Sequence, residues 1–493
     1  MEVDKLSNEE HDEIGVNEAE EDYLVKTIGA FGAWQAKVCI LATLTRFLAM
    51  WNMLNIMFLT YDNKFICVKF NGTRLNVTTS TCYDNCVKYA FEEGIFVKSF
   101  VSDFELICEK AWMASFTQTI LMFGLLFGVY LFGWLSDRFG RRKAIFSSAF
   151  FVVILMLASS FAYDYWTFCT LRFLTGVATG GVLIVSIVMV LEVVGPQHRE
   201  AAGCGINLPD GLAEASLVSF VQFSPTWRIY ILSMSGASAL IMVFLVLLPE
   251  SPRWLMARGR LDEVKALMMK AAKRNNLDLT TTEESISSIL SRESKEIKTT
   301  TYCDLFKTKK LFTRTLCSAL VWMIAGMGYF GITQYCTFLG TNVFVSVVIM
   351  GLMQIPAAFI ASWLNKVYGR KATIMSNLSI TGLTMFLLIF ASPGHWAALT
   401  LGVAGLWAVT ITFNVLYVYV SELFPTPLRN MGYGVSSSGA KIGAMVAPFI
   451  ANLSPHWIPS LIFSVLAFLG AGVCCALPET KGRALKDELG HVD

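Results

Sequence analysis

Charged residues are scarce in this chain of 493 residues: aspartate, glutamate, lysine and arginine together make up 15% of it, against 55% hydrophobic residues. A soluble globular domain usually carries about 25% charged residues, so this composition argues against a soluble protein. The formal net charge of +2 offers no large basic field for nucleic acid. The distribution of the apolar residues therefore decides the class of the protein.

Patterns that bind metals or nucleotides are also missing. Only five histidines occur, and neither an HExxH nor a CxxC spacing is present, so no metal site is predicted. The turn at 133–143 contains glycine and basic residues but lacks the Gly-Lys-Ser/Thr order of a phosphate-binding loop. We therefore expect no cofactor, no ATP-driven pumping and no enzymatic activity.

The apolar residues fall into blocks of about 20, the length that an α-helix needs to cross about 30 Å of hydrocarbon. Glycine, serine, threonine and proline interrupt several blocks, as transmembrane helices allow. Twelve blocks are long enough to span: 37–60, 112–135, 144–163, 166–189, 203–223, 228–248, 312–334, 343–364, 372–391, 397–420, 432–453 and 457–477. The sequence thus predicts an all-α polytopic membrane protein.

A hydrophilic stretch divides these spans six and six. We predict an N-terminal half at 23–248, a cytosolic linker at 249–311 and a C-terminal half at 312–478. The acidic residues 1–22 are expected to form a disordered cytosolic tail, and 479–493 a second cytosolic tail. Within the linker, the Ser/Thr-rich segment 276–300 is expected to be flexible.

Lysine and arginine in the short loops predict the orientation. They follow the second, eighth, tenth and twelfth spans, which all end on the same side of the membrane. The residues are Arg138, Arg141, Arg142, Lys143, Lys366, Arg370, Lys371, Arg429, Lys481, Arg483 and Lys486. We expect this side, and with it both termini, to be cytosolic.

The hydrophilic loop 61–111 then lies outside the cell. It carries two glycosylation sequons, at Asn71 and Asn76. It also carries four cysteines, for which a disulfide framework with three possible pairings is plausible in an oxidising compartment. These cysteines are Cys67, Cys82, Cys86 and Cys108. Sequons and cysteines agree with the topology that the charges predict.

One loop motif occurs in both halves. The segment 133–143 (GWLSDRFGRRK) follows the second span, and 365–371 (NKVYGRK) follows the eighth. A motif at the same place in two halves indicates an internal repeat. The motif resembles the loop signature of the major facilitator superfamily, which implies two related six-helix halves. Asn365 stands where that pattern has aspartate, which weakens the charge contacts expected in the second half.

Further segments narrow the resemblance. They are 29–35 (GAFGAWQ), 102–108 (SDFELIC), 249–255 (PESPRWL), 421–426 (SELFPT) and 478–482 (PETKG). Together they resemble solute carrier family 22, the organic cation, anion and carnitine transporters. Sugar carriers share the proline-glutamate motifs but lack the long glycosylated cysteine loop. The resemblance implies a plasma-membrane transporter of small organic ions, working by alternating access with a possible coupling ion.

Acids and bases at the cytosolic helix ends are candidate gating residues. We expect ion pairs among them to hold the inner gate closed while the cavity opens outward, and to part when the halves rock. The alternative is that these charges only fix the topology. The candidates are Asp137, Arg138, Arg141, Glu192, Arg199, Glu250, Arg253, Glu422 and Arg429.

Ionisable groups inside spans are costly, so they are candidate functional residues. Asp210 and Glu214 lie four residues apart in the fifth span, on one helical face, and Lys441 lies in the eleventh span. Arg172 in the fourth span lies toward the outside and is a further candidate for bonding neighbouring helices. Three interpretations stay open: structural pairing among these groups, recognition of substrate charges, or a coupling proton on Asp210 or Glu214.

The resemblance also bears on the substrate. Anion and carnitine transporters carry a basic residue at the position of Lys441, and cation transporters an acid; a second cation-associated acid is replaced here by Gln354. Both differences favour a zwitterionic or anionic substrate, ahead of a simple cation or a sugar. A receptor that has lost transport is the rival from another class. Further cavity candidates are Tyr329, Phe330, Gln334, Asn414, Tyr417, Asn52 and Asn55.

Overall fold

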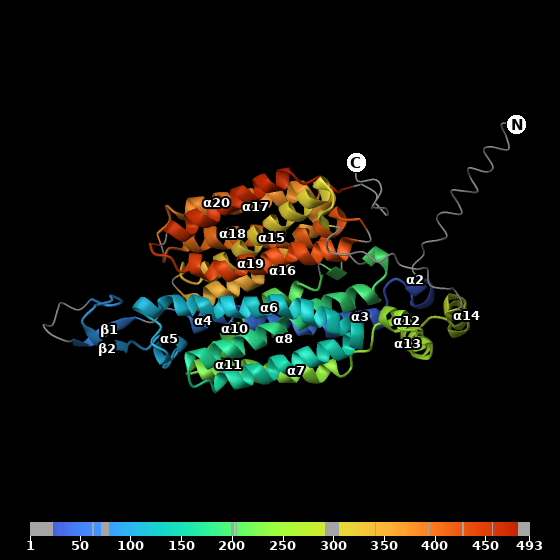
Figure 1. Ribbon diagram of the computed structural model, residues 1–493, viewed down its shortest axis with the longest axis horizontal. Helices are drawn as coiled ribbons and strands as arrows, with labels where there is room; N and C mark the ends of the chain where they lie inside the picture. The colour runs from blue at the N-terminus through green and yellow to red at the C-terminus, as the bar shows by residue number, and fades with distance from the viewer. Residues whose placement is uncertain are drawn as a thin grey trace.

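All twelve predicted spans are helical in the computed structural model (Figure 1). It describes residues 23–61, 64–70, 78–198, 202–203, 205–290, 305–340, 342–392, 394–425, 428–455 and 457–481. The N-terminal half contains α3 (Ala33–Leu54) with its continuation α4 (Ile56–Leu59), α6 (Ala111–Phe139), α7 (Arg141–Ser160), α8 (Tyr165–Val193), α10 (Leu208–Gln222) and α11 (Trp227–Leu245). The C-terminal half contains α15 (Lys309–Cys336), α16 (Val343–Val367), α17 (Arg370–Leu388), α18 (Trp396–Leu423), α19 (Arg429–Ala451) and α20 (Trp457–Cys475).

Nine of these helices, within the described ranges, are long and apolar enough to cross a membrane on their own. The other three are α10, α17 and α19. The first of them has only 15 residues, and α19 carries Lys441 among many glycines and serines. All three pack inside the same bundle as their neighbours. Small and polar residues suit such contacts, because they let helix backbones approach closely. The predicted polytopic all-α fold is confirmed.

Two pairs of helices join the halves. Helix α6 packs on α19, and α10 packs on α16. At the second contact Gly211 faces Gly351, and a Cβ atom added to Gly211 would lie 2.2 Å from the carbonyl oxygen of Gly351. Only glycine permits this approach, so the two backbones touch directly across the interface between the halves.

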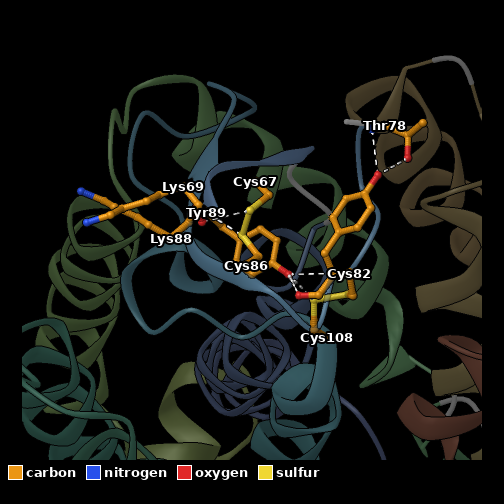
Figure 2. Close-up of a disulfide and its surroundings, with 9 residues drawn as sticks. Cys67, Lys69, Thr78, Cys82, Cys86, Lys88, Tyr89 and Cys108 are labelled. Atoms are coloured by element: carbon orange, nitrogen blue, oxygen red, sulfur yellow. Dashed lines mark hydrogen bonds between the residues drawn. A yellow bond between two sulfur atoms is a disulfide. The ribbon is translucent and has the colours of Figure 1, made fainter. Parts of the chain in front are cut away.

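The loop between the first two spans is a small disulfide-bonded hairpin (Figure 2). Strand β1 (Phe65–Phe70) pairs antiparallel with β2 (Cys86–Phe91), and α5 (Phe100–Asp103) and η1 (Cys108–Lys110) lead into α6. Of the three possible pairings the structure has Cys67–Cys86 and Cys82–Cys108, with Cα–Cα distances of 5.9 and 5.7 Å. Both sequons, at Asn71 and Asn76, lie outside the described residues.

The central stretch is more ordered than the sequence suggests. It forms α12 (Pro252–Ala257), α13 (Leu261–Arg274) and α14 (Leu279–Leu290), which lie at the opposite end of the bundle from the hairpin (Figure 1). Helix α14 falls within the segment expected to be flexible. It packs on α13 and on α2 (Tyr23–Ile28), and these tertiary contacts stabilise a helix in part of this polar segment. The predicted N-terminal tail, 1–22, lies outside the described residues. The predicted C-terminal tail, 479–493, lies outside them from residue 482 onward.

Candidate functional site

A cavity of about 1030 Å³, including open solvent, lies between the two halves at the middle of the bundle. Both halves line it, the N-terminal half with mainly aliphatic side chains and the C-terminal half with aromatic and polar ones. The N-terminal residues are Arg46, Met50, Met53, Met122, Leu125, Val129, Leu183, Ile184, Ile187, Asn207 and Asp210. The C-terminal residues are Tyr329, Phe330, Gln354, Ala358, Thr410, Phe413, Asn414, Tyr417, Tyr433, Ser437, Ala440, Lys441 and Ala444.

On the hairpin side of this cavity, contacts between the halves close the bundle. Asn452 Nδ2 donates to Ser115 Oγ at 2.8 Å, and Thr119 Oγ1 donates to the carbonyl oxygen of Met445 at 2.6 Å. Farther out, Tyr61 stacks on Phe338 with ring centroids 5.9 Å apart. Because all three contacts join α3–α6 segments of one half to α15–α19 segments of the other, the cavity is closed on the hairpin side in this conformation.

Hydrogen bonds also join the halves at the level of the cavity and at its edge away from the hairpin. Asn207 donates to Asn414 at 3.0 Å, and the hydroxyls of Tyr130 and Ser438 lie 2.6 Å apart. Tyr130 is 44% exposed, so this second bond lies at the surface of the protein. On this side of the cavity the halves are therefore joined by polar contacts.

Arg46 and Asp210 form a buried ion pair in the cavity wall. Arg46 Nε donates to Asp210 Oδ1 at 2.9 Å and Nη2 to Oδ2 at 2.5 Å, a bidentate arrangement, and Nη2 also lies 3.1 Å from Asn207 Oδ1. The two side chains are 4% and 10% exposed. Arg46 was not among the sequence candidates, although an arginine in the middle of the first span is as costly as the other ionisable groups. Asp210 is thus neutralised within its own half.

Lys441 has no such partner. Its ammonium donates to the carbonyl oxygen of Ser437, one turn earlier on the same helix, at 3.1 Å. No acid lies within ion-pair distance of it in the described part of the chain. Lys441 lines the cavity, so its charge faces the space between the halves. Structural pairing of Lys441 with the acids of the fifth span, one of the three interpretations left open by the sequence, is not present in this conformation.

Glu214 lies behind the cavity wall, fully buried between α10 and α16. Gln354 Nε2 donates to Glu214 Oε2, and Tyr329 OH donates to Gln354 Oε1 at 3.0 Å. The second carboxyl oxygen of Glu214, Oε1, has no hydrogen-bond partner in the structure. Gln354 therefore separates Glu214 from the cavity and also connects the two halves.

Aromatic side chains form a continuous surface on the C-terminal half of the cavity. The ring of Phe413 lies 5.7 Å from the rings of both Tyr329 and Tyr417, and Tyr417 lies 6.3 Å from Tyr433. Asn414 lines the cavity beside them. Of the sequence candidates, Asp210, Tyr329, Phe330, Gln354, Asn414, Tyr417 and Lys441 all meet here.

Other candidates lie elsewhere. Gln334 is outside the cavity lining, where its amide lies 3.4 Å from Asn452 in the outer contact region. Asn52 donates to the carbonyl oxygen of Leu48 on its own helix, and Asn55 is buried at the junction of α3 and α4. Arg172 donates to the carbonyl oxygen of Asn52 at 3.3 Å, so it bonds a neighbouring helix, as expected.

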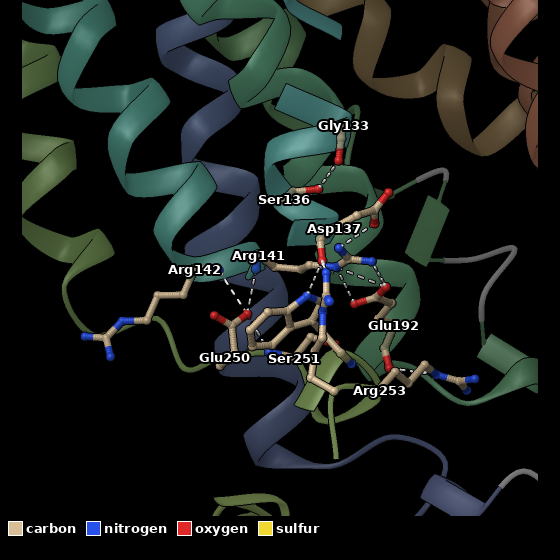
Figure 3. Close-up of polar contacts among 11 residues, drawn as sticks. Gly133, Ser136, Asp137, Arg141, Arg142, Glu192, Glu250, Ser251 and Arg253 are labelled. Carbon is tan, nitrogen blue, oxygen red and sulfur yellow. Dashed lines mark hydrogen bonds and ion pairs between the residues drawn. The ribbon is translucent and has the colours of Figure 1, made fainter. Parts of the chain in front are cut away.

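At the end of the N-terminal half away from the hairpin, acids and bases form a cluster that we call the N-latch (Figure 3). The Arg141 guanidinium binds Glu192 with Nη2–Oε1 2.7 Å and Asp137 with Nη1–Oδ1 2.7 Å. Glu250 accepts from the backbone N–H groups of Arg141 and Arg142 at 2.7 and 3.1 Å. Gly140, with φ of 107°, makes the turn that exposes these N–H groups.

The C-terminal half repeats this arrangement as the C-latch. Arg370 binds Glu422 with Nη2–Oε1 2.9 Å, and Glu479 accepts from the backbone N–H groups of Arg370 and Lys371, both at 3.0 Å. Gly369 has φ of 92°. Arg370 Nη1 donates to the backbone carbonyl oxygen of Asn365 at 3.3 Å, whereas Arg141 Nη1 binds the Asp137 carboxylate in the N-latch. The C-latch therefore has one ion pair fewer, as the weaker second motif predicts.

Glu479 shows how the latch backbone stabilises a carboxylate. Its partial burial acts to raise the pKa, but the N–H groups of Lys481, Arg370, Thr480 and Lys371 donate to the carboxylate and outweigh it. The net pKa is lower than the ordinary value. The contact therefore stabilises the fold at neutral pH, and this contribution is lost as the pH falls through the lowered pKa.

Each latch joins helices of one half only. The pairs Arg141–Glu192 and Arg370–Glu422 do not cross to the other half, unlike the gate that the sequence suggested. Among the remaining candidates, Arg253 Nε donates to the carbonyl oxygen of Glu192, Arg138 lies over the ring of Trp134, and Arg429 begins α19. Arg199 lies outside the described residues. A role in closing the gate between the halves stays a prediction for these residues.

Loss of the latch contact should destabilise the protein. For Glu192→Gln we expect a loss of about 1.5–3 kcal/mol, the range for hydrogen bonds to charged groups, seen as a lower melting temperature of the purified protein. Glu263→Gln is the matched control, because its partner Arg260 is 46% exposed and exposed pairs contribute about 0–1 kcal/mol. Equal melting temperatures for the two variants would contradict a stabilising N-latch.

Comparisons with known proteins agree with this geometry. The family described as "Sugar (and other) transporter" matches residues 38–488. "Solute carrier family 22 member 3" of Mus musculus is 30% identical over 397 residues, which cover 80% of this chain and 71% of that protein. "Organic cation/carnitine transporter 2" of Homo sapiens is 27% identical over 416 residues, covering 84% of this chain and 74% of that protein.

Solved structures resemble the fold. The structure described as the inward open conformation of the xylose transporter XylE from E. coli gives a TM-score of 0.67 at 17% identity, covering 91% of this chain and 98% of that one. A partially occluded inward open form of the same transporter gives 0.66 at 17% identity, covering 92% and 100%. This likeness supports the major facilitator fold.

Proposed function

Given that the chain belongs to the sugar (and other) transporter family and, within it, to solute carrier family 22, we propose that it carries a small organic anion or zwitterion across the plasma membrane by alternating access. The protein is a multi-pass membrane transporter of the major facilitator superfamily. The charge of its substrate, the membrane in which it works and the sidedness of its termini belong to the proposal.

One observation carries the substrate charge. Three charged side chains line the cavity, the two cations Arg46 and Lys441 and the anion Asp210, which leaves one positive charge. Arg46 and Asp210 satisfy each other, so the free charge belongs to Lys441. In a site of low dielectric constant, an uncompensated ammonium favours a ligand that brings an anionic group.

The aromatic surface of the C-terminal half, which also carries Lys441, suits the rest of a zwitterion. The rings of Tyr329, Phe413, Tyr417 and Tyr433 line the cavity, where a substrate ammonium over a ring face would gain cation–π attraction of about 0.5–2 kcal/mol. Asn414 and Gln354 add amide groups for hydrogen bonds. A carboxylate at Lys441 and an amine at the aromatic surface therefore describe the substrate class that we favour.

Uptake measurements decide among the candidate substrates. Cells expressing the protein are given labelled carnitine, a β-alanyl amine conjugate, p-aminohippurate and tetraethylammonium, with glucose as a competitor. We expect uptake of the carboxylates, little uptake of tetraethylammonium and no competition by glucose. Uptake of tetraethylammonium alone would favour a cation transporter, competition by glucose a sugar carrier, and binding without flux a receptor.

Rocking of the two halves is the proposed transport step. Each latch holds its own half together while the contacts at Ser115, Thr119 and Tyr61 open and close on the hairpin side. Positively charged loops on the latch side support cytosolic termini. The cysteine hairpin would then be extracellular, with glycans on Asn71 and Asn76.

Glu214 is the residue best placed to carry a coupling proton. A buried carboxylate without a counter-ion is costly, and one of its oxygens lacks a hydrogen-bond partner. The groups that face it are Gln354 of α16 and Tyr329 of α15, while Asp210 one turn away is paired with Arg46 of α3. The contact with Gln354 spans the interface that moves, so protonation can be linked to the conformational change.

Glu214→Gln tests this role. We expect an inward proton gradient to raise uptake several-fold in the wild type and to leave the variant unchanged, because glutamine keeps the shape but carries no proton. Exchange of labelled for unlabelled substrate without a gradient should persist in the variant. The same gradient dependence in both proteins would exclude Glu214 as the proton carrier.

A further inference from the structure

A groove at the latch end of the N-terminal half takes no part in the transport cycle described above. It lies where α3, α11 and α13 meet. Trp34 and Lys37 come from α3, 246–248 follow α11, and Leu267, Lys270, Lys273 and Arg274 come from α13. The adjoining wall contains Arg142, Glu250 and Glu263.

Cations prevail in this groove, and none of them forms an ion pair among the described residues. The basic residues are Lys37, Arg142, Lys270, Lys273 and Arg274. Both acids are already engaged, Glu250 with backbone N–H groups and Glu263 with Arg260. Within the described ranges none of the three lysines nor Arg274 forms an ion pair. Arg142 donates to the carbonyl oxygen of Val246 at 3.0 Å, and it extends away from the Arg141–Glu192 contact (Figure 3).

The groove also lies where the apolar surface of the bundle ends. Ile40 on α3, Val243 and Phe244 on α11, and Val246 and Leu247 after it are each more than half exposed. In a membrane protein, such side chains face lipid tails. The basic groove next to them is therefore at the level of the lipid headgroups.

Contacts fix the groove in place. Asn275, which follows α13, donates to the carbonyl oxygen of Ile28 and to Gln35 Oε1, both at 2.8 Å, and accepts from the backbone N–H of Trp34 at 2.8 Å. The basic end of α13 is thus tied to the start of α3. Lys273 and Arg274 also suit the negative end of their helix, but Lys37 and Lys270 have no such explanation.

We propose that this groove binds the phosphate headgroup of an anionic phospholipid of the cytosolic leaflet, whose acyl chains lie along α3 and α11. The proposal rests on the cytosolic sidedness of the latch end. Basic residues close to a membrane surface attract anionic headgroups, and here the cations are gathered in a depression with apolar walls on its membrane side. The ligand is a membrane lipid and not a transported solute.

Two triple variants test the site in the purified full-length protein. Lys270→Gln, Lys273→Gln and Arg274→Gln remove three charges from the groove. Lys309→Gln, Lys310→Gln and Lys366→Gln remove three exposed charges from the same end of the C-terminal half. Binding to phosphatidylserine in mixed micelles with phosphatidylcholine is measured, with inorganic phosphate as a soluble competitor. Size-exclusion chromatography confirms that both variants are folded, and Lys270→Gln alone replaces the first if it is not.

The groove variant should bind phosphatidylserine about a hundredfold more weakly, since each of the three basic residues near a membrane contributes about 1 kcal/mol, while the control variant stays close to the wild type. Lys270→Gln alone should lose about fivefold on the same basis. Equal losses in the groove and control variants would overturn the proposal, as would binding that does not prefer phosphatidylserine. Displacement by inorganic phosphate at the same concentration would also overturn it, by indicating a free-anion site. Because the readout is lipid binding, these results are independent of which solute is transported.

Discussion

Lys441→Gln should reduce the uptake of carboxylate substrates about ten- to hundredfold. The variant keeps a polar side chain but removes the charge that, among the described residues lining the cavity, alone has no counter-ion. A charge-assisted hydrogen bond contributes about 1.5–3 kcal/mol, and each 1.4 kcal/mol corresponds to about a factor of ten in affinity. Initial uptake rates at several substrate concentrations measure the loss.

The controls separate charge recognition from folding. Lys310→Gln removes a lysine from the exposed start of α15 and should leave uptake unchanged. Lys441→Arg keeps the charge and should retain a preference for carboxylates, at reduced affinity because the guanidinium is larger. Equal loss for carboxylates and for tetraethylammonium, at normal surface expression, would show that Lys441 supports the helix and does not recognise charge.

Breaking the Arg46–Asp210 pair should have the largest effect on stability. The pair is buried and bidentate, so Arg46→Met leaves Asp210 as an uncompensated buried charge, and Asp210→Leu does the same to Arg46. Removing one partner of a buried ion pair costs about 3–5 kcal/mol. We expect each single variant to lose most of the monodisperse protein in size-exclusion chromatography after solubilisation.

The double variant distinguishes two roles for the same pair. Replacing both charges with apolar residues of similar volume is often nearly neutral, so Arg46→Met with Asp210→Leu should recover most of the folded protein. If it does, its uptake shows whether the pair also contacts substrate. A double variant as unstable as the worse single variant would show that the charges have separate partners, among which Asn207 is the first to examine.

Much of the fold follows from local signals in the sequence, because apolar length and repeated loop motifs do not depend on long-range contacts. The twelve spans and the two halves are of this kind. The partners of charged residues do depend on long-range contacts. The sequence predicts that Glu192 and Arg141 lie at the same end of the bundle, but their ion pair within one half depends on how α7 and α8 pack. The disulfide pairing is open for the same reason, since four cysteines allow three connectivities.

Arg46 shows a signal that the sequence did contain. An arginine at the centre of a predicted span requires a counter-ion or a cavity, and Asp210 in another span was its available partner. Gln354 shows the reverse. Gln354 became a site candidate because it stands where cation transporters of the family carry an acid. Its hydrogen bonds to Glu214 and Tyr329 could not be predicted, because they form only where α10, α15 and α16 pack together.

The direct contact of Gly211 with Gly351 has a mechanical consequence. Most helix contacts interlock through side chains, and relative motion then requires rotamers to change before the helices can move. Where two backbones touch with hydrogen atoms alone between them, no side chain has to leave a pocket. Displacement of α10 along α16 at this level therefore meets low steric resistance. Even a methyl group at either position would collide with the facing backbone and slow the conformational change in each transport cycle.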